Sequence, residues 1–324
     1  MTELITAEII ADSISQQGVR ITTFCLEYPR IIHSELMTHR LLSRNAMSSR
    51  AIPIATMIKQ VMSDPAMPVR FGANQPGMQD KGGNHTQEIN AGYTAEEWWR
   101  LAGISAAKFA EGFAEADYHK QIGNRLLEPF QRMKTIVTST DWNNFFWLRV
   151  DKDADPTIYA LAAEMHRAYQ DSKPELLKAG QWHTPYVYHT FDPYNPEEFE
   201  GYYVEDENGI AIDLTEAQAL AISASCCAQV SYRRLNSTKD KALDIYEKLL
   251  SGNKVHASPF EHQATPFQDV IDDSWKGRYV NNFDDPGTWE KGITHVDRDG
   301  NFWSGNLRGW SQHRQSVPNH TVRG

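Results

Sequence analysis

The start of the chain alternates between apolar and polar side chains in two runs. Over residues 6–28 the apolar positions, which extend from Ile9 to Leu26, recur at close to every second residue, and Gln-Gln-Gly separates the two runs. A period of two places apolar side chains on one face of a strand, and a short segment with glycine lets the chain reverse. The pattern therefore predicts a β-hairpin.

Over much of the remaining chain, apolar residues recur with the period of an α-helix. Pro29 is a start signal for one helix, and Thr94 with Glu97 is typical of the capping box that begins another. Prolines in 180–199 indicate a loop or connector. The helical segments are 29–45, 55–64, 94–132 (one or two helices), 154–177, 215–233 and 239–252. Hairpins and helices without a regular strand–helix alternation predict the α+β class.

Composition and charge narrow the class of protein. Hydrophobic residues make up 40% of the 324 residues, and no apolar run reaches the roughly 18 residues of a membrane span. The N-terminus lacks the basic start of a signal peptide, and an odd number of cysteines, three, argues against a disulfide framework. We therefore expect a cytoplasmic protein. Neither C-x-x-C nor H-E-x-x-H occurs, so we predict no metal site.

The net charge of −10 disfavours a protein that coats nucleic acid, but a small anionic ligand needs only a local cationic cluster. Residues 34–53 provide one, with three arginines, one histidine, four serines and no acid after Glu35. Hydroxyls, exposed backbone N–H groups and an arginine fork together suit a phosphate. A solvated helix end with a serine-rich cap is the alternative interpretation.

Two further arginines lie among apolar residues, Arg125 in NRLLEPF and Arg149 in NNFFWLR. A buried arginine needs a partner, because an unpaired charge is costly in a low-dielectric interior. That partner is either a carboxylate of this protein or a ligand anion. Near the C-terminus Ser258 opens a proline-fixed turn, which is followed by Glu261.

The stretch THRLLSRNAMSSR resembles the signature of the flavin-dependent thymidylate synthases, which reads Arg-His-Arg, seven residues and then serine. His39 and Arg40 with Ser48 supply the match. NRLLEPF, NNFFWLRVDKDADPTI and SASCCAQVSY…GNKVHASPFEH resemble three other segments of the family. In the common form of the family the last of these precedes the Arg-His-Arg helix. The chain therefore looks circularly permuted or partly duplicated, which is compatible with folding where the new termini lie at the surface.

The resemblance implies one flavin-dependent thymidylate synthase-like domain over 1–324, an antiparallel sheet with long helices, in which 180–215 connects two sequence halves. It also implies a homotetramer that binds FAD between subunits. The implied reaction transfers a one-carbon unit from methylenetetrahydrofolate to C5 of deoxyuridylate, with NADPH as the reductant of the flavin. Such a route needs no cysteine nucleophile, and Arg149 would polarise the pyrimidine.

Carried over position by position, the resemblance implies two sets of binding residues. The first would bind the pyrimidine nucleotide, with Arg149 also as the catalytic group: Glu35, Ser48, Ser49, Arg50, Arg125 and Arg149. The second would bind the cofactor: His39, Arg40, Ser43, Asn45, Asn144, His256, Ser258 and Glu261. Within these sets, Ser48, Arg50 and Arg125 would hold the phosphate and sugar, and His256 would lie near the flavin or the folate.

Four positions depart from the family pattern. Thr38 replaces the first arginine, Ala46 replaces a glutamate, and Glu35 and Asp155 replace glutamines. A carboxylate at position 35 repels a phosphate unless an arginine neutralises it, whereas it can accept a hydrogen bond from the amino group of cytosine. The amides of 74–79 are candidates for the missing contacts. Two alternatives stay open: hydroxymethylation of deoxyuridylate or action on deoxycytidylate, and a non-catalytic nucleotide-binding homologue.

Overall fold

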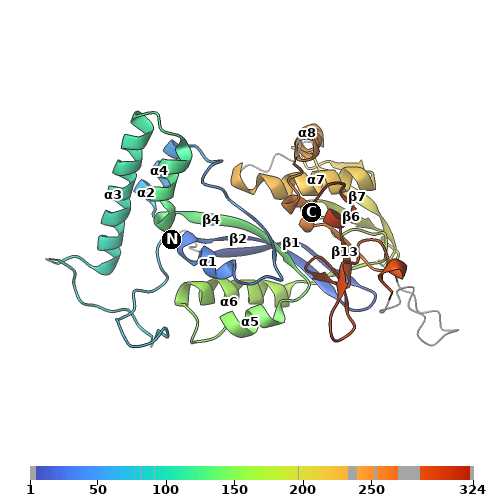
Figure 1. The fold of residues 1–324 in the computed structure, drawn as a ribbon, viewed down its shortest axis with the longest axis horizontal. Helices are drawn as coiled ribbons and strands as arrows, with labels where there is room; N and C mark the ends of the chain where they lie inside the picture. Colours follow the sequence, from blue (N-terminus) through green and yellow to red (C-terminus); the bar gives the residue numbers. More distant parts are fainter. Residues whose placement is uncertain are drawn as a thin grey trace.

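The computed structural model describes residues 5–80, 82–90, 92–195, 197–232, 239–251, 254–268 and 285–321. It contains both helices and largely antiparallel sheets, which confirms the predicted α+β class. Figure 1 shows a central sheet with helices on both sides and a helical arm at one end. Within the described ranges, no helix is both long enough and apolar enough to cross a membrane.

Five strands form the central sheet, in the order β3 (Ser43–Ala46), β4 (Arg132–Ser139), β2 (Arg20–Pro29), β1 (Thr6–Ser15) and β5 (Glu175–Leu177). β1 and β2 are the predicted hairpin, which is confirmed. The reversal between them needs a residue with positive φ, and Gly18 supplies it at 78°. β4 pairs antiparallel with β2, whereas β5 pairs parallel with β1.

Two helices cover one face of this sheet, α5 (Asn143–Arg149) and α6 (Pro156–Asp171), as Figure 1 shows. α6 is the amphipathic helix predicted from the sequence. Its apolar side includes Leu161 and Met165, which are fully buried in the main core. Burial of such a side chain contributes roughly 1.5–3 kcal/mol, so this contact anchors the α5–α6 unit and with it Arg149.

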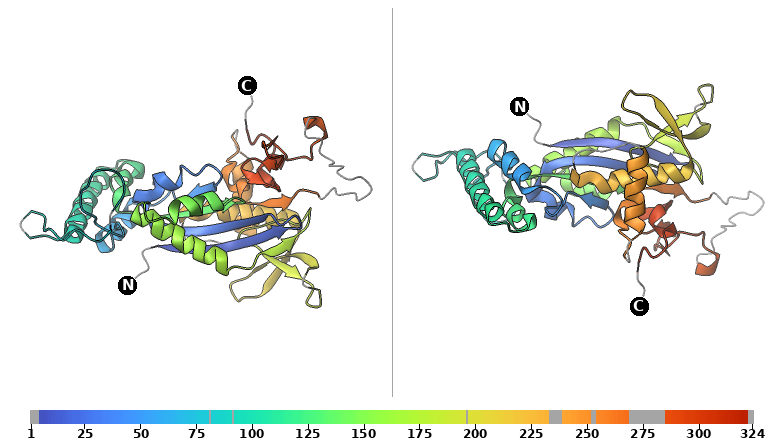
Figure 2. Two further views of the ribbon diagram at one scale, coloured as in Figure 1. Left: turned by 90° about the horizontal axis from the view of Figure 1, so that it is seen from below. Right: turned by 90° about the horizontal axis from the view of Figure 1, so that it is seen from above.

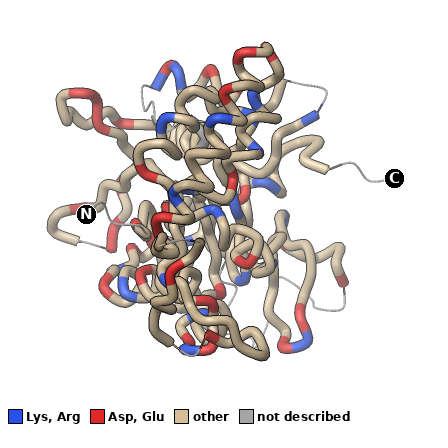
Figure 3. The backbone as a smooth tube through the Cα atoms, turned by 90° about the vertical axis from the view of Figure 1, so that its left-hand side faces the viewer, with Lys and Arg blue, Asp and Glu red and all other residues tan. Residues whose placement is uncertain are grey.

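The arm at one end of the molecule consists of α2 (Ile54–Ser63), α3 (Ala95–Glu115) and α4 (Lys120–Leu126), which pack on one another (Figures 1 and 2). These helices confirm the two helical segments predicted there, and Thr94 and Glu97 form the predicted capping box. Figure 3 views the molecule from this end and shows acidic and basic residues interspersed along the chain. The cationic character of residues 34–53, which precede α2, is therefore confined to that stretch.

The C-terminal half lies beside the other face of the central sheet (Figure 1). Its helices are α7 (Glu216–Ala228) and α8 (Lys239–Leu250), both as predicted. Its strands are β6 (Tyr188–Phe191), β7 (Phe199–Glu205), β8 (Ala211–Leu214), β9 (Ala264–Pro266), β10 (His295–Val296), β11 (Phe302–Ser304), β12 (Leu307–Arg308) and β13 (Trp310–Gln312). β6, β7 and β8 form an antiparallel sheet within 180–215. That segment is thus more regular than a loop, and its place as a connector between two halves stays a prediction.

The helix predicted over 29–45 is wrong beyond its first turns. The structure has a 3₁₀ turn (Arg30–Ile32) and one α-helical turn, α1 (His33–Leu36), after which the chain reverses into β3. β3 pairs antiparallel with β4, and Ser43 lies opposite Thr138. Pairing with a strand from a distant part of the sequence overrides the local helical spacing.

Candidate functional site

Arg149 joins two other predicted site residues at the C-terminal end of α5. Its Nη1 donates to Oε2 of Glu35 (3.1 Å), and its Nε donates to Nε2 of His39 (3.0 Å). The His39 ring packs edge-on against Phe145, with ring centroids 4.9 Å apart. Glu35, His39 and Arg149 therefore form one group, the Arg149 cluster, although the helix that was predicted to align the first two ends at Leu36.

Burial and neighbouring charges set the protonation of the Arg149 cluster. Burial, reinforced by the charges of Arg149 and Arg44, lowers the pKa of His39 to about 4, so the ring is neutral at pH 7 and Nε2 can accept. Burial raises the pKa of Glu35, the charge of Asp155 acts in the same direction, and Arg149 opposes both. The sequence left two kinds of partner open for Arg149, a carboxylate of the protein or a ligand anion. The structure contains the carboxylate, which belongs to Glu35.

Strand β3 brings Ser43 and Asn45 against the C-terminal half. Ser43 Oγ donates to Oδ1 of Asn306 (3.0 Å), and Asn45 Nδ2 donates to the carbonyl oxygen of Cys227 (3.1 Å). Both side chains are buried. Their hydrogen bonds are made with the protein itself, so in this structure they position β3.

Two residues that the sequence analysis missed complete this region. Gln312 donates from Nε2 to Ser43 Oγ (3.4 Å), and Arg314 forms an ion pair with Glu261. Burial raises the pKa of Glu261, and the charge of Arg314 opposes that effect. The Gln-His-Arg triplet that contains both residues echoes the Thr-His-Arg of the signature, and this echo is the sequence signal that could have identified them.

Ser48 and Arg50 line a hollow of about 560 Å³ between the loop after β3 and the start of α4. Ala51, His119 and Gln121 complete its lining, so none of the five lining residues is acidic. In the described part of the chain, Arg50 has no ion pair with a carboxylate. The hollow therefore offers guanidinium, imidazole, amide and hydroxyl groups to a ligand.

The loop that carries Ser48 and Arg50 is fastened to α4. Asn124, which is fully buried, donates from Nδ2 to the carbonyl oxygens of Ser49 (2.8 Å) and Ile52 (2.9 Å). Lys120 Nζ donates to the carbonyl oxygen of Ala51 (3.0 Å). Because α4 holds the loop at three carbonyl groups, the backbone of the loop keeps a fixed position relative to α4.

The apolar surroundings predicted for Arg125 are wrong, because its side chain is exposed on α4. α4 turns Asn124 inward, and the next residue consequently faces outward. Glu128 pairs with Arg30 (2.8 Å) and accepts a hydrogen bond from Ser49 Oγ (2.6 Å). Neither Ser49 nor Arg125 is among the residues that line the hollow.

The remaining candidates have exposed side chains: Arg40, Asn144, His256 and Ser258. They are accessible to a ligand from solvent. Their roles toward a flavin stay predictions.

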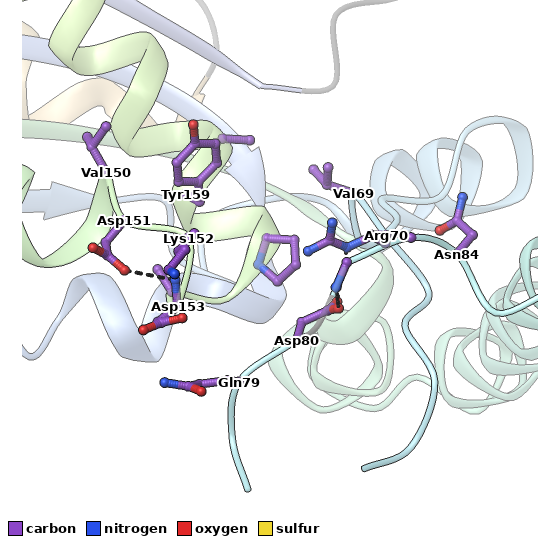
Figure 4. Close-up of a pocket in the computed structure, with 15 residues that line it drawn as sticks. Val69, Arg70, Gln79, Asp80, Asn84, Val150, Asp151, Lys152, Asp153 and Tyr159 are labelled. Atoms are coloured by element: carbon purple, nitrogen blue, oxygen red, sulfur yellow. Dashed lines mark hydrogen bonds and ion pairs between the residues drawn. The ribbon is translucent and has the colours of Figure 1, made fainter. Parts of the chain in front are cut away.

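A larger cavity of about 940 Å³ adjoins the C-terminal end of α5 (Figure 4). One wall belongs to 69–84, where Arg70 pairs with Asp80 (3.0 Å), and the other belongs to 150–160. Gln79, an amide of the 74–79 stretch, is part of the lining. Three acidic and two basic side chains share these walls, which makes this cavity less suitable for a phosphate than the smaller hollow.

The three cysteines do not provide a thiolate. All are buried and free. Burial raises the pKa of Cys226 to about 12 and also raises the pKa of Cys227 and Cys25. Because the thiolate is the nucleophilic form, attack on a substrate by cysteine is disfavoured.

No family model matches the sequence, and no curated protein sequence matches it. Among the solved structures that are similar to parts of the protein are two enzymes. One is a UMP/dUMP methylase, PolB, from Streptomyces cacaoi bound with 5-Br UMP, at 16% identity and a TM-score of 0.38 over 51% of this chain and 88% of that one. The other is Thymidylate Synthase X (ThyX) from Helicobacter pylori with FAD and dUMP, at 13% identity and a TM-score of 0.32 over 46% of this chain and 67% of that one. At these identities and TM-scores, we take the function from the residues of the protein itself.

Proposed function

We propose that the protein binds a pyrimidine deoxynucleoside monophosphate, deoxyuridylate, with the phosphate in the hollow lined by Ser48 and Arg50. The observation that carries this proposal is the acid-free lining of that hollow on a loop fixed to α4. An arginine fork beside hydroxyl and amide donors suits a phosphate. The signature motif assigns the same two residues to the substrate.

We further propose that the protein is an FAD-dependent enzyme that methylates C5 of this nucleotide with methylenetetrahydrofolate as donor and NADPH as reductant. When bound, the flavin supplies the electrons that reduce the transferred methylene unit to a methyl group. The buried thiols support a route without cysteine attack. Arg149 would polarise the pyrimidine, and for that contact it must leave Glu35 or share it.

The exposed polar residues fit a flavin better than the buried ones do. Arg40, Asn144 and Ser258 present side chains that a flavin can reach from solvent. The buried Ser43 and Asn45 already bond to the protein and would act by positioning β3. A homotetramer in the cytoplasm, with flavin sites between subunits, is part of this proposal.

A specific observation favours a second candidate reaction. Glu35, where the family has glutamine, places a carboxylate 3.1 Å from Arg149. A carboxylate can accept from the exocyclic amino group of cytosine, which uracil lacks. Action on deoxycytidylate, or hydroxymethylation in place of methylation, is therefore the alternative.

The test begins with an absorbance spectrum of the purified protein before and after incubation with FAD. We expect a bound flavin, and a protein that stays colourless would overturn the enzyme proposal in favour of a non-catalytic homologue. Deoxyuridylate and deoxycytidylate are then supplied separately with methylenetetrahydrofolate and NADPH, and the products are weighed by mass spectrometry. Turnover of deoxycytidylate alone would contradict the proposed substrate.

Substitution of the hollow tests where the phosphate binds. Ser48→Ala and Arg50→Ala should each weaken deoxyuridylate binding roughly tenfold, because each removes a donor to a charged oxygen. Flavin affinity should change less. Arg100→Ala, at an exposed position of α3, is the control. Equal losses of nucleotide and flavin affinity would contradict a phosphate site in the hollow.

A further inference from the structure

His119 lines the same hollow as Ser48 and Arg50, and no motif of the sequence pointed to it. It is the residue that caps α4, where its Nδ1 accepts a hydrogen bond from the backbone N–H of Gln121 (3.3 Å). The ring is thus held by α4, the helix that also fastens the loop that carries Ser48 and Arg50.

The cap determines which ring nitrogen carries the proton. In a neutral imidazole one nitrogen accepts and the other donates. Since Nδ1 of His119 accepts the N–H of Gln121, the proton must be on Nε2. The ring is therefore an N–H donor on a side chain that lines the hollow.

The fold fixes the backbone of the loop that carries Arg50 relative to the helix that His119 caps. Asn124 and Lys120, both on the helix that His119 caps, hold the carbonyl groups of the loop that carries Arg50. A ligand that contacts both His119 and Arg50 therefore requires little movement of the backbone, which lowers the entropic cost of binding.

We propose that His119 is a phosphate-binding residue, which donates from Nε2 to a terminal phosphate held on its other side by Arg50. The ligand class is a phosphate monoester, whose free terminal oxygens can accept from both walls at once. The proposal rests on the phosphate site proposed above and adds a residue of the α4 N-terminus that binds the phosphate.

The test uses His119→Ser in the full-length protein. Serine is as good a helix cap as any residue, so this change removes the ring donor and retains the cap. We expect the dissociation constant of deoxyuridylate, measured by titration calorimetry, to rise roughly tenfold. Binding of deoxyuridine, which lacks the phosphate, should stay unchanged, and inorganic phosphate should compete less well with deoxyuridylate. His85→Ser, at an exposed histidine that is not among the lining residues, is the matched control.

Three outcomes would overturn the inference. One is a deoxyuridylate affinity of His119→Ser within about twofold of the unchanged protein. Another is an equal loss for deoxyuridine and deoxyuridylate. The third is an equal loss in His85→Ser. If Arg50→Ala weakens deoxyuridylate binding and His119→Ser does not, only the role of His119 falls; if neither does, the phosphate site falls with it. His119→Asn, which also retains a cap, replaces the serine variant if its melting temperature is lowered.

Discussion

Arg149 is the residue whose neighbours bear most directly on the proposed chemistry. Its guanidinium contacts Glu35 and the neutral ring of His39, so in this structure it is paired within the protein. Arg149→Ala should lower kcat roughly a thousandfold, the loss typical for removal of a group that stabilises developing charge. FAD should stay bound, because Arg149 is not among the proposed flavin residues. Turnover assays with a flavin absorbance spectrum check this, and normal turnover would exclude the role.

Glu35, where the signature resemblance predicts a glutamine, forms an ion pair with Arg149 and so competes with a ligand for its guanidinium. Glu35→Gln removes a negative charge from a partly buried site and lets Arg149 turn to a ligand. We expect deoxyuridylate to bind roughly threefold to tenfold more tightly, and deoxycytidylate to lose affinity if Glu35 accepts from its amino group. Titration calorimetry with each nucleotide measures the two affinities. Weaker binding of deoxyuridylate would mean that Glu35 orients Arg149 rather than competing for it.

At the scale of elements, α4 organises the hollow through a single buried amide. Asn124→Ala would leave the carbonyl groups of Ser49 and Ile52 without their donor. Leaving buried polar groups unsatisfied costs roughly 1–3 kcal/mol, so we expect the free energy of unfolding to fall by about 2 kcal/mol and deoxyuridylate binding to weaken. Urea unfolding and calorimetry measure the two effects.

The control for that change is Asn208→Ala, in the exposed turn between β7 and β8. It should alter the free energy of unfolding by less than about 0.5 kcal/mol, as exposed substitutions generally do. If the Asn124 variant loses stability but binds deoxyuridylate normally, the loop does not need α4 to hold the phosphate.

Elements whose formation depends only on residues close together in the sequence were predictable from the sequence. The hairpin needed only its period of two and Gly18, and α3 needed only Thr94 and Glu97. β3 was mistaken for a helix because its state depends on β4, a strand remote in the sequence. The exposure of Arg125 likewise follows from which face α4 buries, and a run of apolar neighbours does not reveal that.

The residues of the candidate site likewise include some that a local sequence pattern reveals and others that it does not. The signature motif led to Ser48 and Arg50, which line one hollow, because the loop that joins them is short. Gln312 reaches Ser43 across a sequence separation of 269 residues, and only the folding of the C-terminal half onto β3 brings the two together. No local pattern encodes such a contact, so the residues from the far end of the chain were missed.

At the scale of the whole molecule, a chain of buried hydrogen bonds joins the central sheet to the C-terminal half. Ser13 and Thr23 bond to the two ring nitrogens of His183 (2.9 and 2.8 Å). Thr23 also bonds to Thr138 (2.7 Å), which bonds to Nδ1 of His262 (2.8 Å). Both rings are fully buried. These bonds tie strands of the N-terminal half to His183, within 180–215, and to His262, which follows it. Complete burial requires both histidines to be neutral.

This requirement predicts how stability depends on pH. Burial lowers the pKa of His262 to about 3 and the pKa of His183 well below its ordinary value. The unfolded chain protonates both near pH 6.5, so below about pH 6.5 unfolding takes up protons and the free energy of unfolding falls, by about 1.4 kcal/mol per pH unit for each histidine. The raised pKa of Glu261 acts in the opposite sense, since its contribution is lost as the pH rises.

Urea unfolding between about pH 7 and about pH 5 measures this slope. His262→Gln should lower stability at neutral pH and reduce the slope by roughly a fifth, because five histidines of the described chain have a lowered pKa: His33, His39, His183, His262 and His313. His85→Gln, at an exposed position, should leave the slope unchanged. A slope that persists in full in His262→Gln would mean that His262 does not contribute to the acid sensitivity.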